Sequence, residues 1–254
     1  MSRTSYQAGE SNSRRFGETV RYFFIIVASF IVLQAVLVIM HEFTHSTTAW
    51  ALGDMASPWG IVWGNPLTMT GWDEGVDYSR LFAEGRLVQA AFIGVSPLLV
   101  HGIMVILGLY FMQKRSVAGR TWLFHIIYWF TVANFMELIA YIFMRPFAQH
   151  GDTGIFNRGL GLSPWIFFAV ASLALLAGLW KFFRRAVPLA NDVLARGNPY
   201  TQWTILAMSA FIMFLWGSEI RVMAYVPGPQ WMFGLIGIPA FLLVLFLFHP
   251  QPTQ

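Results

Sequence analysis

The sequence predicts an all-α, polytopic membrane protein, and two observations carry that prediction: composition and the length of the apolar segments. The 254 residues are 57% hydrophobic and only 11% charged, whereas charged residues make up about 25% of a typical soluble domain. Several apolar segments reach the length of about 20 residues that a helix needs to cross the hydrocarbon core of a bilayer. We therefore expect about six transmembrane helices in a single domain that covers residues 22–250.

Six apolar segments are the candidates for these helices. The first covers residues 22–40, and its helical pattern continues to about Leu52. The other five cover residues 87–112, 122–144, 164–183, 203–223 and 231–248. Tryptophans near many of the ends are typical of side chains at the membrane–water interface. The polar segment 1–21 has few apolar groups to bury, which predicts a disordered tail on the cytoplasmic side.

The lysines and arginines predict the orientation of the bundle. Eleven of them precede the first span or lie in the second and fourth connections, and five lie on the opposite side. Because short cytoplasmic loops are enriched in these residues, both termini are expected in the cytoplasm. We expect an integral, multi-pass protein of a bacterial inner membrane, with the lipid bilayer as its environment. No segment resembles a nucleic-acid-binding module, so nucleic acid is not an expected partner.

The first outer loop, residues 54–86, has a different character from the spans. It contains "SPWGIVWGNPLTMTGW", in which two short runs rich in Ile, Val, Trp, Leu and Thr flank Gly64, Asn65 and Pro66. Strand-forming residues on both sides of turn-forming residues predict a small β-hairpin at the outer surface.

The motif "HEFTH" follows the first apolar run and contains His41, Glu42 and His45. Residues four apart lie on one face of a helix, so the two imidazoles can bind one cation with the glutamate beside it. Zinc lowers the pKa of bound water to about 7, and a neighbouring carboxylate can take the proton. The motif therefore predicts a Zn²⁺ site with Glu42 as general base. The alternative is a hydrogen-bonded helix end at the membrane surface.

A catalytic zinc ion needs a third protein ligand, and two acidic residues are candidates. Asp152 lies in "HGDTG", and Glu137 lies in the third predicted span, one helical turn after Asn134. The predicted topology places both acidic residues at the same membrane side as His41. Glu137 could instead support a histidine ligand through a hydrogen bond, so the sequence leaves the choice open.

Together these motifs resemble the site-2 protease family of intramembrane zinc metalloproteases, which combine a His-Glu helix with a later asparagine and a glycine-flanked aspartate. The resemblance implies His41, His45 and Asp152 as ligands. It implies Glu42 as base and Asn134 as a residue that orients the substrate or stabilises the oxyanion. It also implies that the hairpin presents an extended substrate strand. The chain departs from the family pattern because no proline follows Asn134 and glycine, not leucine, precedes Asp152.

The predicted function is intramembrane, zinc-dependent hydrolysis of a membrane-inserted protein substrate. The alternative is a non-catalytic metal-binding or inactive protease-like subunit that stabilises a larger complex. His101 and His125 could suggest haem, but their predicted depths differ by roughly 10 Å, so we expect each to be a hydrogen-bonded interior side chain. His150 is expected to be a loop residue, with an accessory ligand role as the alternative.

Overall fold

The computed structural model describes residues 3–65, 71–148, 150–220 and 234–250. It is 79% helical, which confirms the all-α class. The elements run in the order α1 (Arg3–Ala51), β1 (Ile61–Val62), β2 (Asp73–Glu74), α2 (Tyr78–Ala83), α3 (Leu87–Met112), α4 (Arg115–Ala118), α5 (Thr121–Ile139), η1 (Ala140–Met144), α6 (Asp152–Leu160), α7 (Pro164–Lys181), η2 (Phe182–Ala186), α8 (Val187–Ala190), η3 (Asn191–Ala195), α9 (Pro199–Ala210), η4 (Phe211–Ile220) and α11 (Gly237–Leu247). The segments labelled η are π-helices.

Four helical segments are long and apolar enough to cross a membrane: residues 12–51, 87–112, 121–143 and 164–195. They coincide with the first four predicted spans. The fifth predicted span falls on α9 and η4. The sixth was expected to begin at Trp231, but residues 221–233 lie outside the described part of the chain, and α11 contains only 11 residues. Length and composition thus establish four candidate spans, and the total of six stays a prediction.

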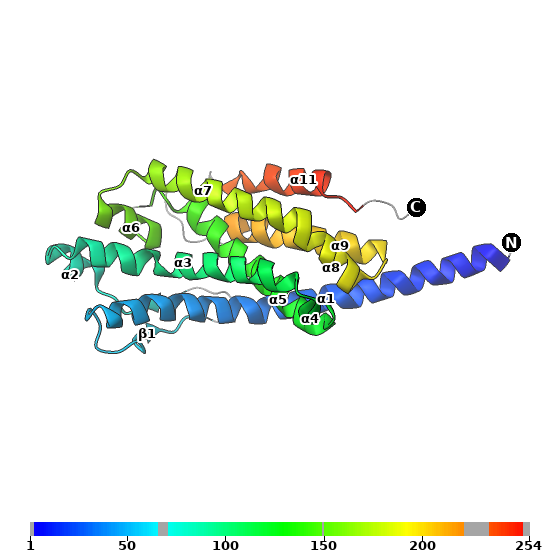
Figure 1. Ribbon diagram of the computed structural model, residues 1–254, viewed down its shortest axis with the longest axis horizontal. Helices are drawn as coiled ribbons and strands as arrows, with labels where there is room; N and C mark the ends of the chain where they lie inside the picture. The colour runs from blue at the N-terminus through cyan, green and yellow to red at the C-terminus, as the bar shows by residue number, and fades with distance from the viewer. Residues whose placement is uncertain (1–2, 66–70, 149, 221–233, 251–254) are drawn as a thin grey trace.

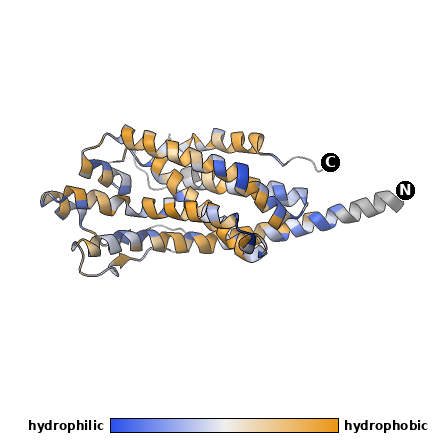
Figure 2. Ribbon diagram, viewed as in Figure 1, coloured by the Kyte–Doolittle hydropathy of each residue, from blue (hydrophilic) through white to orange (hydrophobic). Residues whose placement is uncertain are grey.

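The long helices lie side by side, with α5 in the interior of the bundle (Figure 1). Of the apolar window in the α5–η1 span, 78% is buried, against 28% in α1. Large side chains such as Trp129 and Tyr128 are fully buried on α5. The outer helices present apolar side chains instead (Figure 2), and Ile106 and Leu173 are 67% and 70% exposed. Such extended apolar surfaces mark contact with lipid.

Helix α1 begins at Arg3, which differs from the disordered tail that composition predicts for residues 1–21. The polar segment forms an extension of the first span and projects beyond the bundle (Figure 1). Two features of the sequence favour this continuity. No proline interrupts the helix before Ala51, and Arg14 pairs with Glu18 one turn later at 3.1 Å.

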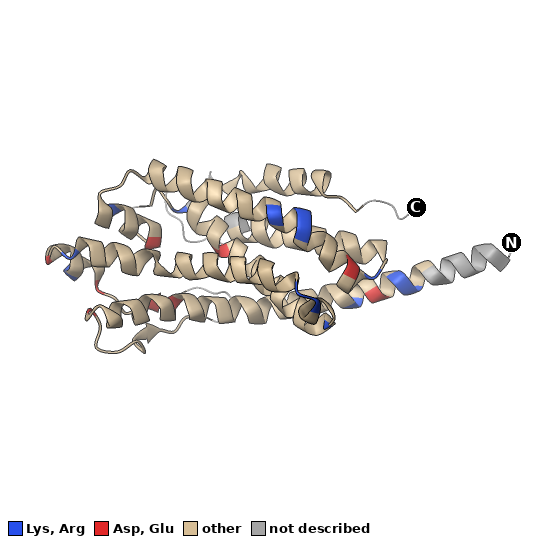
Figure 3. Cartoon of the chain, in the orientation of Figure 1, with Lys and Arg blue, Asp and Glu red and all other residues tan. Residues whose placement is uncertain are grey.

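The two ends of the bundle differ in charge and in the side-chain bonds that link neighbouring segments there. Basic residues gather near the ends of α3 and α7 and along the projecting part of α1 (Figure 3). At this end the amide of Asn198 donates to the carbonyl of Arg15 at 2.8 Å, and Arg196 donates to the hydroxyl of Thr121 at 2.7 Å. At the opposite end Arg86 pairs with Asp54. These bonds tie helices that are distant in sequence.

The first outer loop contains one short antiparallel pairing, in which Ile61 opposes Glu74 and Val62 opposes Asp73. Residues 66–70, on which part of the expected hairpin falls, lie outside the described residues. The loop therefore has a two-residue strand on each side, and the full hairpin stays a prediction. The pairing brings Glu74 towards the end of α1 that carries the histidines, since its carboxylate lies 4.0 Å from the ring of His45.

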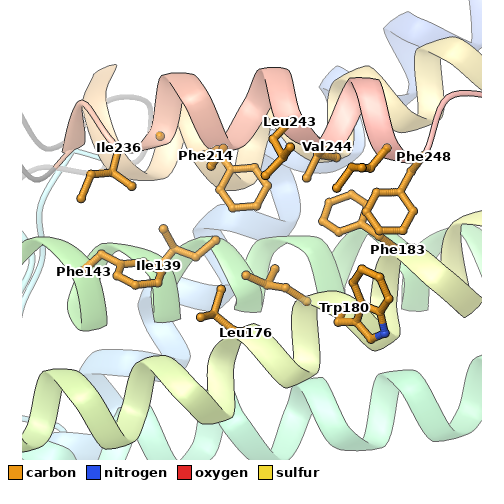
Figure 4. A pocket seen from close by; sticks show the side chains of 14 residues that line it. Ile139, Phe143, Leu176, Trp180, Phe183, Phe214, Ile236, Leu243, Val244 and Phe248 are labelled. Atoms are coloured by element: carbon orange, nitrogen blue, oxygen red, sulfur yellow. The ribbon is translucent and has the colours of Figure 1, made fainter.

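An apolar cavity of about 320 Å³ lies between α7 and α11. Figure 4 shows aromatic and aliphatic side chains around it, among them Phe183 and Phe248. These two rings stack with centroids 5.4 Å apart. The aromatic contact at one end therefore holds α11 against the bundle while the middle of the interface stays loosely packed.

Helices α3 and α6 approach each other closely because glycines lie between them. A Cβ atom at Gly94 would lie 2.9 Å from the carbonyl oxygen of Asp152. A Cβ atom at Gly159 would lie 2.5 Å from the carbonyl oxygen of Leu87 and 2.8 Å from the Cβ atom of Ala91. Both contacts involve backbone atoms, which a rotamer change leaves in place. The position of α6, and of Asp152 at its first turn, thus depends on these two glycines.

We expect Gly159→Ala to lower the free energy of unfolding by about 1–3 kcal/mol, because overpacking forces two helices apart. Thermal unfolding in detergent, followed by circular dichroism, measures this change. Gly102→Ala, on the partner helix α3, is the matched control, because a Cβ atom there meets nothing within 4 Å. Equal melting temperatures for the two variants would contradict the packing argument.

Candidate metal centre

Three side chains from two helices meet at one end of the bundle. His41 and His45 lie one turn apart on α1, and Asp152 begins α6. The Asp152 Oδ2 atom lies 3.0 Å from His41 Nε2 and 3.3 Å from His45 Nε2. The two Nε2 atoms are 3.3 Å apart. The three ligand atoms therefore form a nearly equilateral triangle.

The size of this triangle fits a zinc ion. Zinc holds tetrahedral ligands at about 2.0–2.1 Å, which places neighbouring ligand atoms about 3.3 Å apart. The three residues are at most 9% exposed, so bulk water provides little competing solvation. Two imidazoles and one carboxylate form a ligand set typical of catalytic zinc, with a fourth position left for water or substrate. The group could hold a metal ion.

The ionised state of Asp152 suits a metal ligand. Burial opposes ionisation of the carboxyl group, but the nearby charges and hydrogen bonds of His45 and His41 hold its pKa well below the usual range. The carboxylate thus stays ionised across the physiological pH range. An ionised, buried oxygen needs a positive charge beside it, which a protonated imidazole or a bound cation supplies.

The second nitrogen of His45 fixes its tautomer. Nδ1 lies 2.8 Å from the backbone carbonyl oxygen of Ile93, and a carbonyl only accepts hydrogen bonds. A neutral His45 therefore carries its proton on Nδ1 and directs the lone pair of Nε2 towards Asp152. Hydrogen bonds of this kind orient metal-binding histidines in many proteins.

A chain of hydrogen bonds fixes the tautomer of His41 in the same way. The side-chain nitrogen of Asn134 donates to the carbonyl of Phe130 at 2.8 Å, which leaves its oxygen facing His101 Nδ1 at 2.9 Å. A neutral His101 must then donate from Nδ1 and accept at Nε2. His41 Nδ1 lies 3.1 Å from that Nε2 and donates to it. The lone pair of His41 Nε2 consequently faces Asp152 and His45.

A second acidic group lies beside this triad. The carboxylates of Glu42, Asp73 and Glu74 have oxygen atoms within 4.8 Å of one another, and Glu42 is 9% exposed. Burial and the hydrogen bond with Glu74 raise the pKa of Asp73 to about 6. The strand pairing therefore places two further carboxyl groups next to Glu42, the residue directly after His41.

Sequence reasoning did not identify two residues of this site, Tyr141 and Tyr78. The Tyr141 hydroxyl lies 3.3 Å from His41 Nε2, and its ring stacks on that of His41 with centroids 5.2 Å apart. The Tyr78 hydroxyl lies 3.5 Å from His45 Nδ1. A signal for Tyr141 was present, because residues 134, 137 and 141 share one helix face by their i, i+3 and i+7 spacing.

The other candidate residues lie outside the triad. Glu137 is buried on α5 but does not belong to the group formed by His41, His45 and Asp152. His150 is exposed. His125 is bound by Tyr22 at 3.1 Å and by Ser29 at 2.9 Å, so both His125 and His101 are hydrogen-bonded interior histidines, as predicted.

Comparison of the chain with models of known protein families, with characterised proteins and with solved structures gave no match. The chemistry of the site therefore has to be argued from its own residues.

We expect the purified protein to bind one zinc ion per chain, and His41→Ala, His45→Ala or Asp152→Ala to abolish this binding, because two ligands hold zinc far more weakly than three. Elemental analysis after dialysis measures the stoichiometry. The exposed His150→Ala variant should retain the ion. Loss of zinc in His150→Ala, or its retention in all three triad variants, would contradict the assignment.

We expect Asn134→Leu to weaken zinc binding by about 10- to 100-fold, because partners that orient a histidine ligand contribute this much to affinity. Asn134→Asp should lose less, since a carboxylate still accepts from His101 Nδ1. Competition with a chromogenic chelator gives both affinities, and equal losses would show that only packing around Asn134 matters.

Proposed function

We propose that the protein is an intramembrane zinc-dependent peptidase that hydrolyses a membrane-inserted protein substrate. The observation that supports this most is the triangle of His41, His45 and Asp152, with Glu42 beside it. The ligand set leaves one position open, which a structural zinc site with four protein ligands lacks. The site also lies near the end of an apolar helix that is long enough to cross a membrane. Both termini are then cytoplasmic and the site faces outward, as the basic residues predict.

In this proposal different residues carry out the separate steps of hydrolysis. Zinc, when bound, supplies Lewis acidity and lowers the pKa of water. Glu42 takes a proton as the water oxygen bonds to the peptide carbonyl carbon, and it returns that proton to the amine nitrogen as the C–N bond breaks. Tyr141 donates a hydrogen bond to the developing oxyanion, a role supported by its position beside the ligand nitrogen of His41.

Asn134 receives a different role from the one implied by the resemblance to site-2 proteases. Its amide nitrogen is bonded to Phe130 and its oxygen to His101, so neither group is directed at a substrate. We assign Asn134 and His101 as positioning residues for His41. Tyr141 then takes over the oxyanion contact that the resemblance gives to asparagine.

The outer loop supports binding of an extended substrate. Strand β1 has its other edge unpaired within the described residues, and side chains beside it are exposed, with Trp59 at 75%, Val62 at 54% and Trp63 at 60%. The ring of Phe43, inside the zinc motif, contacts Trp59 with centroids 5.2 Å apart. A substrate strand added to β1 would therefore lie close to the metal ligands.

We expect Glu42→Gln to retain zinc but to abolish cleavage of a co-expressed single-span substrate, because the amide has no basic oxygen to take a proton from water. Gel mobility of a doubly tagged substrate measures cleavage, and elemental analysis measures zinc. Asp73→Asn is the control for charge in the same cluster and should retain cleavage. Equal cleavage by Glu42→Gln and the unmodified protein would favour the non-catalytic alternative, a metal-binding subunit of a larger complex.

A further inference from the structure

A long groove of about 510 Å³ runs between α3 and α7, with α5 as its floor. Its walls are aliphatic and aromatic, and among the described residues Lys181, at the end of α7, is the only charged one that lines it. Small residues create the space: Gly102, Ala171 and Ala174 line the walls, and a Cβ atom at Gly102 would meet nothing within 4 Å. The groove lies on the membrane-spanning part of the bundle, away from the candidate metal triad.

The dimensions of the groove decide what it can hold. Val95 and Leu109 on α3 both line it, so it extends about 21 Å at 1.5 Å per residue, more than one hydrocarbon leaflet of about 15 Å. Spread over that length, this volume corresponds to a channel roughly 8 Å across, whereas a helix with its side chains is about 10–12 Å wide. A hydrocarbon chain about 4 Å thick at van der Waals contact fits the groove. A transmembrane helix of a partner is too wide.

Positive charge gathers where the groove ends. Lys181 lines that end, and Arg184 and Arg185 follow within about one turn as exposed side chains of η2 (Figure 3). Lys114, just after α3, holds its ammonium 4.0 Å above the ring of Tyr110. Basic pockets between membrane helices bind anionic lipid head groups. The apolar length and the cationic end are thus complementary to the two parts of one lipid molecule.

We propose that this groove is a binding site for an anionic phospholipid, with one acyl chain between α3 and α7 and the phosphate paired with Lys181 and the arginines of η2. The inference stands independently of the proposed peptidase function. It uses none of the metal-binding residues, and it commits to lipid because the groove is too narrow for a second helix.

The test uses the full-length protein, delipidated in mild detergent, with phosphatidylglycerol and phosphatidylcholine of identical acyl chains as probes. Native mass spectrometry gives the affinity for each lipid. We expect one phosphatidylglycerol molecule to bind with an affinity at least about fivefold higher than that of phosphatidylcholine, since each basic residue near a membrane surface contributes about that factor. Equal binding of the two lipids would overturn the proposal.

Two pairs of variants locate the lipid. Gly102→Phe fills the groove and should weaken both lipids about tenfold, since several methylene groups lose their apolar contacts; Ile103→Phe, on the adjacent residue that is 51% exposed, should not. Lys181→Gln should lower the preference for phosphatidylglycerol about fivefold and leave phosphatidylcholine binding unchanged, whereas Arg120→Gln, at the same end of the bundle, should preserve the preference. If Gly102→Phe fails to fold, Gly102→Leu replaces it.

Unchanged lipid binding in the filled-groove variant would overturn the proposal. A change of oligomeric state in Gly102→Phe without loss of lipid would also overturn it, because the groove would then belong to an interface between copies of the chain.

Discussion

The fold at the histidine-bearing end of the bundle depends on one electrostatic constraint, the meeting of three electron-rich atoms in a buried place. His41 Nε2, His45 Nε2 and Asp152 Oδ2 lie within 3.3 Å of one another, and the hydrogen bonds behind the rings direct nitrogen lone pairs inwards. A proton can neutralise one of these contacts, but a divalent cation can bind all three atoms at once. The glycine contacts of α6 and the asparagine on α5 both serve this convergence.

The local part of this site could be predicted from sequence. The pair His41 and His45 with Glu42 between them follows from helical spacing alone, and an α-helix is the state that an apolar run of this length adopts in lipid. Four apolar helices of membrane-spanning length were also predicted correctly, because length and hydropathy are properties of a single segment. The helix class, the histidine pair and the interior histidines are therefore all consequences of short-range pattern.

The remaining features depend on contacts between segments, which a single sequence does not encode in its spacing. The choice of Asp152 over Glu137 as the neighbour of the histidines depends on how closely α6 packs on α3. The hydrogen bond from His41 to His101 joins residues 60 positions apart. Tyr141 reaches the site because it lies on η1, a π-helix that follows α5. The helix over residues 3–21 was not predicted from composition, because composition indicates only how much apolar surface a segment can bury. A continuous helix also gains from local pairs such as Arg14 with Glu18.

Helix α1 also has a mechanical consequence. It runs from Arg3 to Ala51 without a proline, so the same rigid rod carries the projecting polar end at Arg3 and, about 57 Å further on, the two imidazoles. Hydrogen bonds to α9 hold this rod near Arg15 and Thr19, and hydrogen bonds to α3 hold it at His41 and His45. The projecting end and the two histidines consequently belong to one continuous element that neighbouring helices fix at two separate levels.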